Sequence, residues 1–131
     1  MLSARNQSGD VLAFEVGLED GPFACPACGA EVILKRGRKV IAHFAHLARA
    51  NCTYAGEVES EEHKQTKIEI YKSLIRVPGV SNVRMEYYLR DAKADVYFVL
   101  RGEGVAIEVQ ISKISPDDID KRTKAYTTRN I

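Results

Sequence analysis

The sequence lacks several features that define whole classes of protein. It contains no tryptophan among its 131 residues, and aromatic residues make up only 8% of it. Hydrophobic residues still reach 45%, enough for a sizeable core in one ordinary domain with a small appendage. No apolar run approaches the roughly 20 residues that span a bilayer, and residues Met1 to Asp10 lack the apolar centre of a signal peptide. These absences exclude a membrane-spanning helix and lead us to expect a cytoplasmic protein.

An excess of one charge is also missing, since 19 basic and 18 acidic residues leave a net charge of +1. A protein that coats DNA is usually more basic, but an enzyme that touches a few phosphates is not excluded. Positive charge is concentrated in one run, which is either a solvated hairpin turn or a set of phosphate contacts. The candidate DNA contacts are this run together with two later residues: Lys35, Arg36, Arg38, Lys39, Lys113 and Arg122.

The three cysteines argue against a disulfide framework in the cytoplasm and instead indicate a metal site. Cys25 and Cys28 have the spacing of a zinc knuckle, and histidines and a third cysteine follow within one small unit. The preferred ligand set is Cys25, Cys28, His46 and Cys52, with His43 as a substitute for His46. The alternative is a group of reduced thiols beside histidines that form hydrogen bonds. A Zn²⁺ ion would stabilise a unit with so little apolar core.

The first part of the chain, residues 1–58, predicts a small β-rich, zinc-ribbon-like unit. Val11 to Val16 is a short strand, and Asp20-Gly21-Pro22 is a turn. Glu31 to Lys35 and Val40 to Phe44 flank Arg36-Gly37-Arg38, which indicates a β-hairpin. An irregular connection is expected from about Leu47 to Val58.

Residues 59–131 predict an α-β-β-β-α order with a mixed, α+β-like sheet. Ser60 caps a helix with acidic residues in its first turn, and Val77-Pro78-Gly79 ends it. Three strand-like runs follow: Val83 to Leu89, Ala94 to Leu100, and Val105 to Ile111. Ser115-Pro116 starts a second helix that should run to about Thr127. A last strand is expected next, so the fold is expected to be truncated after Ile131.

Two carboxylates and a glutamine meet at one edge of this predicted sheet. Asp95 opens the second strand, while Glu108 and Gln110 lie on the third and face the same side because they are two residues apart. Carboxylates on neighbouring strands suit a hard cation such as Mg²⁺ or Mn²⁺, and the Val109 carbonyl could add a ligand. Gln110 lies two residues after the glutamate, where a metal site of this type usually has a lysine, and it could hold a water. The alternative is that these are ordinary solvent-facing side chains.

The helix before the sheet offers further candidates for catalysis. Glu62 and Lys67 could each reach the acidic edge if the helix packs on the sheet. Lys67 could replace the missing strand lysine, or it could be a surface lysine. His63 could act as a general acid or base near neutral pH, or it could be part of the helix cap.

Several short segments, in order along the chain, resemble the competence protein CoiA family. The N-terminal segments are FACPACGAEVILKRG and AHFAH, and the helix segment is ESEEHKQTKIEIYKSL. KADV resembles the family's R/Q-A-D-V, AIEVQIS resembles its I/L-E-x-Q-x-S, and SPDDIDKRTKAY ends in its R-x-x-x-Y. Lys93 departs from the usual Arg or Gln, and the family's last, tryptophan-containing strand segment is absent.

This resemblance implies a nuclease domain of the PD-(D/E)xK, restriction-endonuclease-like superfamily behind a zinc-finger-like region. By position, Glu62 matches the helix acid, Asp95 the metal aspartate, Glu108 the second acid and Gln110 the variant lysine position. Ser112, Arg122 and Tyr126 match the downstream motif. The implied function is metal-dependent DNA cleavage in DNA uptake, processing or recombination, with DNA and recombination or competence proteins as partners. The alternatives are a non-catalytic DNA-binding accessory factor and a zinc-organised interaction module.

Overall fold

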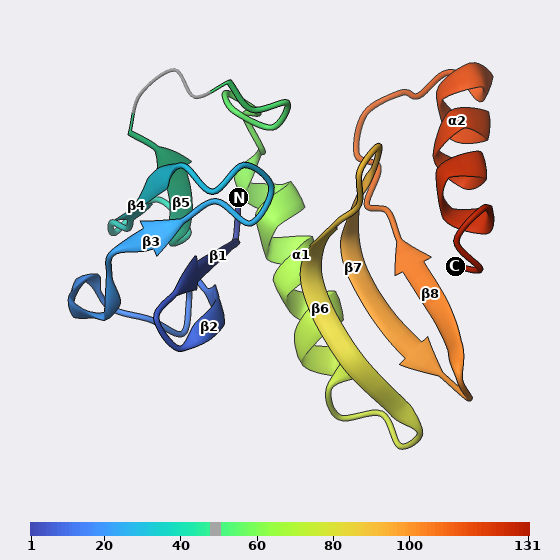
Figure 1. Cartoon of the computed structure of the whole chain (residues 1–131), viewed down its shortest axis with the longest axis horizontal. Coiled ribbons are helices and arrows are strands. Elements are labelled where there is room, and N and C mark those ends of the chain that lie inside the picture. The colour runs from blue at the N-terminus through green and yellow to red at the C-terminus, as the bar shows by residue number, and fades with distance from the viewer. Residues whose placement is uncertain (48–50) are drawn as a thin grey trace. The chain divides into compact units, whose positions relative to one another are not determined.

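The computed structural model describes residues 1–47 and 51–131, and Figure 1 shows their helices and strands. Three residues of the expected irregular connection, 48–50, lie outside the described residues. The chain divides into two compact units, Met1–Lys64 and Gln65–Ile131. No helix in the described ranges combines the length and the apolar character needed to cross a membrane.

The first unit contains an antiparallel sheet of five strands in the order β2-β1-β3-β4-β5. The strands are β1 (Ser3–Asn6), β2 (Gly9–Leu12), β3 (Phe23–Ala24), β4 (Glu31–Lys35) and β5 (His43–His46), with a short 3₁₀ helix, η1 (Leu18–Asp20), after β2. The predicted hairpin is confirmed, because β4 pairs with β5, although β5 starts three residues later than expected.

The strand predicted over residues 11–16 is wrong in its bounds. Asn6 pairs with Gly9, so β1 and β2 form a hairpin whose turn is Gln7 and Ser8. Gly9 adopts a φ of 117°, a conformation open mainly to glycine, and the Asn6 Oδ1 accepts a hydrogen bond from the Ser8 N–H at 2.9 Å. Because the turn lies at these residues, β2 begins and ends earlier in the chain than predicted. Residues 13–15 form the next turn and are not part of a strand.

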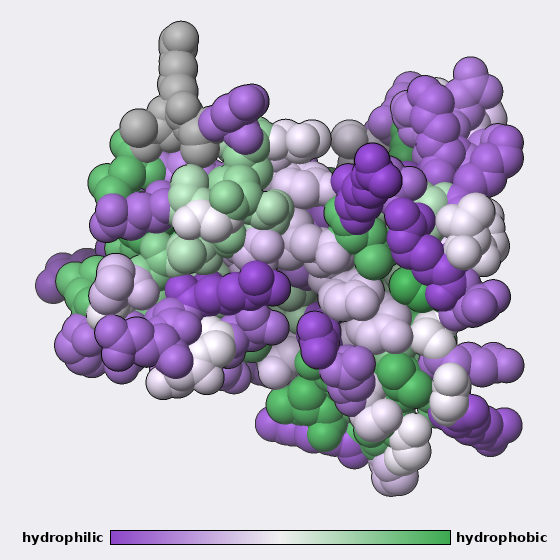
Figure 2. Space-filling model, viewed as in Figure 1, coloured by the Kyte–Doolittle hydropathy of each residue, from purple (hydrophilic) through white to green (hydrophobic). Residues whose placement is uncertain are grey.

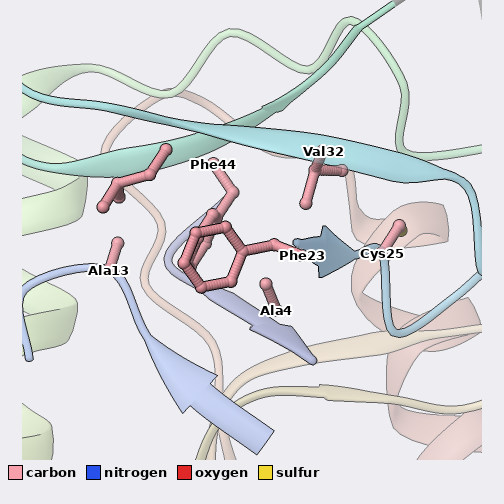
Figure 3. Packing of buried hydrophobic residues seen from close by; sticks show 7 residues of the cluster. Ala4, Ala13, Phe23, Cys25, Val32 and Phe44 are labelled. Carbon is pink, nitrogen blue, oxygen red and sulfur yellow. The ribbon is translucent and has the colours of Figure 1, made fainter. Parts of the chain in front are cut away.

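The core of the first unit is small and centred on two phenylalanines. Alternate residues of β4, Val32 and Leu34, point inward, as period-two alternation requires. The rings of Phe23 and Phe44 lie 5.0 Å apart beside Val32 (Figure 3). Cys25 is buried in the same cluster, so the first cysteine of the knuckle is part of the core, whereas Cys28 is exposed.

The second unit and the helix that leads into it follow the predicted α-β-β-β-α order, which confirms the mixed α and β fold class. The elements are α1 (Glu61–Leu74), β6 (Val80–Tyr88), β7 (Lys93–Leu100), β8 (Glu103–Ile107) and α2 (Pro116–Thr127). The three strands form an antiparallel sheet in the order β6-β7-β8. Ser60 Oγ accepts the His63 N–H at 3.1 Å, and Ser115 Oγ accepts the Asp118 N–H at 3.1 Å, so both predicted serine caps are present. Helix α2 carries mostly polar side chains on the surface seen in Figure 2.

The third strand is shorter than predicted, and the difference falls at the candidate site. The ladder between β7 and β8 ends at the pair Val96 and Ile107. Two residues after Ile107, the Val109 N–H donates to the Asp95 Oδ2 at 2.8 Å instead of to a strand carbonyl. A side-chain oxygen that competes for a backbone donor ends regular pairing. Glu108 and Gln110 therefore follow β8 and do not lie on it.

Candidate functional site

The first unit brings four predicted ligands together. One ligand atom from each of Cys25, Cys28, His46 and Cys52 lies within 4.8 Å of the others. Cys28 Sγ and His46 Nε2 are 3.5 Å apart, close to the roughly 3.6 Å between a sulfur and a nitrogen ligand of a tetrahedral zinc. His43 lies outside this group, and its Nδ1 is 2.8 Å from the Ile41 carbonyl oxygen. A cluster of three sulfurs and one imidazole could hold Zn²⁺.

The knuckle geometry gives its two cysteines different environments. The Cys25 N–H donates to the Ala30 carbonyl and the Gly29 N–H to the Cys25 carbonyl, both at 2.8 Å, with Gly29 at a φ of 75°. Burial raises the pKa of Cys25 to about 11, whereas the Ala30 N–H lowers the pKa of Cys28. Because metal binding requires thiolates, a cation would stabilise the Cys25 anion that burial disfavours.

In the second unit, Asp95 is a buried carboxylate near the start of β7. Its Oδ2 accepts the Val109 N–H, and its Oδ1 lies 3.6 Å from the Lys67 Nζ. The Asp95 side chain thus links strand β7 to the segment that follows β8. These two contacts give the carboxylate a defined orientation.

Lys67 reaches this carboxylate from α1. Its side chain is 0% exposed, so the alternative of a surface lysine is wrong. The Nζ atom donates to the Glu86 Oε1 at 2.7 Å. Burial would raise the pKa of Glu86, but the charge and hydrogen bond of Lys67, together with other positive charges such as Lys93, outweigh burial and hold that pKa at about 2. The structure therefore places a positive side chain beside Asp95, as required of a substitute for the strand lysine.

Glu86 is a site residue that the sequence reasoning missed. It lies on β6 between Met85 and Tyr87, whose partners on β7 flank Asp95. The available signal was that Glu86, a charged residue, lies inside the strand-like run from Val83 to Leu89. A charged residue is rarely buried without a partner, so a buried Glu86 requires one.

Glu108 is held by α2. The Tyr126 hydroxyl donates a short hydrogen bond to its Oε1, and the Arg122 Nη1 lies 3.4 Å from its Oε2. Burial raises the pKa of Glu108, and the negative charge of Asp95 raises it further, whereas the Tyr126 bond lowers it. The negative charges of the two carboxylates therefore interact, and a cation shared by Asp95 and Glu108 stays a prediction.

Gln110 has protein partners at both ends of its amide. Its Nε2 donates to the Ser112 carbonyl at 2.8 Å and to the Ser112 Oγ at 3.0 Å, while its Oε1 accepts from the Arg122 Nη1 at 3.2 Å. Arg122 of α2 thus bridges Glu108 and Gln110. A catalytic role of Gln110 or of Lys67 stays a prediction.

Two further catalytic candidates, Glu62 and His63, lie in the first turn of α1 and belong to the first unit. Glu62 is exposed. The His63 backbone N–H completes the Ser60 cap, and its Nδ1 is 3.3 Å from the Glu59 Oε1. The predicted capping role of His63 is present, and a catalytic role of either residue stays a prediction.

The predicted DNA contacts fall into three settings. The four basic residues at and after the end of β4 are exposed, namely Lys35, Arg36, Arg38 and Lys39, and Lys113 is exposed as well. The Arg36 Nη2 donates to the Val16 carbonyl at 2.8 Å. Arg122 is directed at the acidic edge, where its charge could meet a bound phosphate. A role of these residues in binding DNA stays a prediction.

Comparison with known proteins assigns both parts of the chain. Residues 14–55 match the N-terminal domain of competence protein CoiA, and residues 59–131 match its nuclease-like domain. The chain is similar to the competence protein CoiA of Bacillus subtilis (strain 168), with 32% identity over 111 residues. This match covers 83% of the chain but only 29% of the relative. No solved structure gives a significant match. The chain therefore belongs to the competence protein CoiA family.

Proposed function

We propose that the second unit is the core of a divalent-metal-dependent deoxyribonuclease of the PD-(D/E)xK type. The observation that carries this proposal is the fully buried Lys67, whose Nζ lies 3.6 Å from the buried Asp95 carboxylate. Burial of two charged side chains is costly, and such arrangements concentrate at functional sites. The nuclease-like family match agrees with this reading.

The donor set at the acidic edge suits Mg²⁺ or Mn²⁺, because Asp95 and Glu108 offer hard carboxylate oxygens. Such a cation, when bound, neutralises phosphate charge and activates water for attack on phosphorus. In this scheme, the Val109 N–H orients Asp95 and the Tyr126 hydroxyl orients Glu108. Lys67 places its positive charge where negative charge develops during attack. Arg122 contacts the substrate phosphate from α2.

The other parts of the proposal concern the whole protein. Zn²⁺ at the cluster of three cysteines and His46 stabilises the first unit, and the exposed basic residues after β4 bind the DNA backbone. The protein then acts on DNA in the cytoplasm during uptake, processing or recombination, beside other competence or recombination proteins. Membership of the competence protein CoiA family supports these roles.

A cleavage assay tests the proposed activity. Single-stranded and duplex DNA are incubated with the protein in Mg²⁺, in Mn²⁺ and in EDTA. We expect metal-dependent cleavage that is lost in Asp95→Asn and Glu108→Gln. The control is Asp120→Asn, which removes an exposed carboxylate that pairs with Lys124 on α2 and should leave cleavage unchanged. Activity that persists in EDTA, or in Asp95→Asn, would refute the proposal.

A second candidate is a DNA-binding accessory factor without catalysis. It is favoured by Gln110, which carries no charge and whose amide is engaged by Ser112 and Arg122. For this candidate the same DNA substrates should bind in a salt-sensitive manner and remain intact in every metal. Binding without cleavage by the wild-type protein would therefore decide for it.

A further inference from the structure

Glu86 was not among the expected site residues, and no family motif quoted above includes it. We propose that Glu86 is a positioning residue: it holds the Lys67 ammonium group and keeps it from closing onto Asp95, so that Asp95 remains available to a cation. This inference rests on the proposed function, because it gives Glu86 a purpose at the proposed metal site.

The two distances to the Lys67 Nζ support this role. Glu86 Oε1 lies at 2.7 Å, the length of a charge-assisted hydrogen bond. Asp95 Oδ1 lies at 3.6 Å, beyond hydrogen-bond distance but within range of electrostatic attraction. Lys67 is thus hydrogen-bonded to Glu86 and forms a longer ion pair with Asp95. Without the Glu86 carboxylate, the same ammonium would move closer to Asp95 and repel an incoming cation more strongly.

The backbone at Glu86 is also unusual. Its φ is 53°, the left-handed region, which is strained for a residue other than glycine. Its flanking residues Met85 and Tyr87 remain paired with β7, so the strand continues on both sides of the strained position. The positive φ occurs at the residue whose side chain meets Lys67. Strain retained at such a point is typical of functional sites.

A purely structural ion pair is the competing explanation, and two variants separate it from positioning. Glu86→Gln keeps the shape and one acceptor but removes the charge. The double variant Lys67→Met, Glu86→Leu replaces the pair with apolar side chains of similar size, which often preserves folding. Glu69→Gln, an exposed change on α1, is the control. The measurements are Mn²⁺ affinity by calorimetry, DNA affinity, and the single-turnover cleavage rate at saturating DNA and metal.

For Glu86→Gln we expect about a tenfold weaker Mn²⁺ affinity and a cleavage rate about 10- to 100-fold lower, with unchanged DNA affinity. Glu86→Asp, which retains the charge, should recover part of both losses. The double variant should fold and bind Mn²⁺ at least as tightly as the wild type, because no ammonium faces Asp95, yet it should not cleave DNA. Unchanged Mn²⁺ affinity in Glu86→Gln, or cleavage by the double variant, would overturn the proposal.

The Mn²⁺ titration keeps this inference separate from the proposed activity. If the wild-type protein cleaves no DNA, the nuclease proposal fails, and metal affinity alone decides the role of Glu86. A loss of affinity in Glu86→Gln that is absent from the double variant would still support positioning. Equal Mn²⁺ affinities in the wild type and Glu86→Gln, with cleavage intact in both, would overturn the role of Glu86 and leave the nuclease proposal standing. If Glu86→Gln does not fold, Glu86→Asp and the double variant provide the same comparison.

Discussion

Tyr126→Phe removes one hydroxyl from a side chain that is 8% exposed and whose bond to Glu108 joins α2 to the acidic edge. A hydrogen bond to a charged group contributes about 1.5–3 kcal/mol, and the remaining Arg122 contact at 3.4 Å is long and half-exposed, so it compensates little. Because Glu108 is itself partly exposed, we expect the lower end of this range, about 1.5 kcal/mol. For a unit of this size the loss corresponds to about 6–12 °C in Tm.

The pH dependence of this loss gives a sharper test. Burial raises the pKa of Glu108, so Glu108 contributes stability that is complete below the ordinary carboxyl range and is lost as pH rises through the raised pKa. The Tyr126 bond favours the carboxylate and offsets part of that loss. The effect of Tyr126→Phe on the free energy of unfolding should therefore be larger at about pH 7 than at about pH 4, below the ordinary carboxyl pKa.

Urea unfolding followed by circular dichroism at both pH values measures this difference. The matched control is Tyr97→Phe, which also removes a phenolic hydroxyl and leaves the ring stacked on Tyr87 at 4.4 Å. We expect the control to cost less than about 0.5 kcal/mol. Equal effects of the two variants at neutral pH, or a Tyr126→Phe effect that grows on acidification, would refute this account of Glu108.

Three other predictions concern the zinc cluster, the basic residues and the buried ion pair. Zinc removal, or Cys52→Ala, should abolish hydrogen-exchange protection of the first-unit core around Phe44; unchanged protection would argue against a structural metal. Arg38→Ala should lower DNA affinity and reduce by about 0.9 the slope of log affinity against log salt concentration. Arg36→Ala should have a smaller effect, because its guanidinium already donates to the Val16 carbonyl. Unchanged slopes in both variants would exclude these contacts. As the pH falls from about 4.3 to the Glu86 pKa of about 2, Glu86 gains a proton and the wild type should lose stability. Glu86→Gln should lack this loss. Identical acid unfolding curves for the two proteins would contradict this prediction.

Features governed by neighbouring residues were predictable from the sequence. The second helix begins at Pro116 and ends at Thr127 as expected, because serine, proline and aspartates determine its first turn locally. The cysteine and histidine spacing identified the four residues that cluster, because the knuckle and the hairpin are local structures. The order of the helices and strands after residue 60 followed from alternating apolar patterns in the same way.

Features that depend on tertiary contacts were not predictable. Strand β8 ends at Ile107 because the Asp95 side chain on β7 accepts the Val109 N–H. The two residues of this hydrogen bond are 14 positions apart in the chain. The burial of Lys67 depends on Glu86, 19 residues further along the chain, and no local pattern pairs the two. The first hairpin was missed because its turn, Gln7 and Ser8, depends on the conformation of Gly9 and not on a strong turn signal.

The most direct test of the proposed catalytic site is the position of Mn²⁺ in crystals soaked with that ion, located from its anomalous scattering. The account predicts a peak about 2.0–2.3 Å from carboxylate oxygens of both Asp95 and Glu108, with Lys67 still bonded to Glu86. It also predicts that the peak is absent in Asp95→Asn crystals. A peak only at exposed acidic residues of α2, or none at saturating Mn²⁺, would contradict the proposed catalytic site.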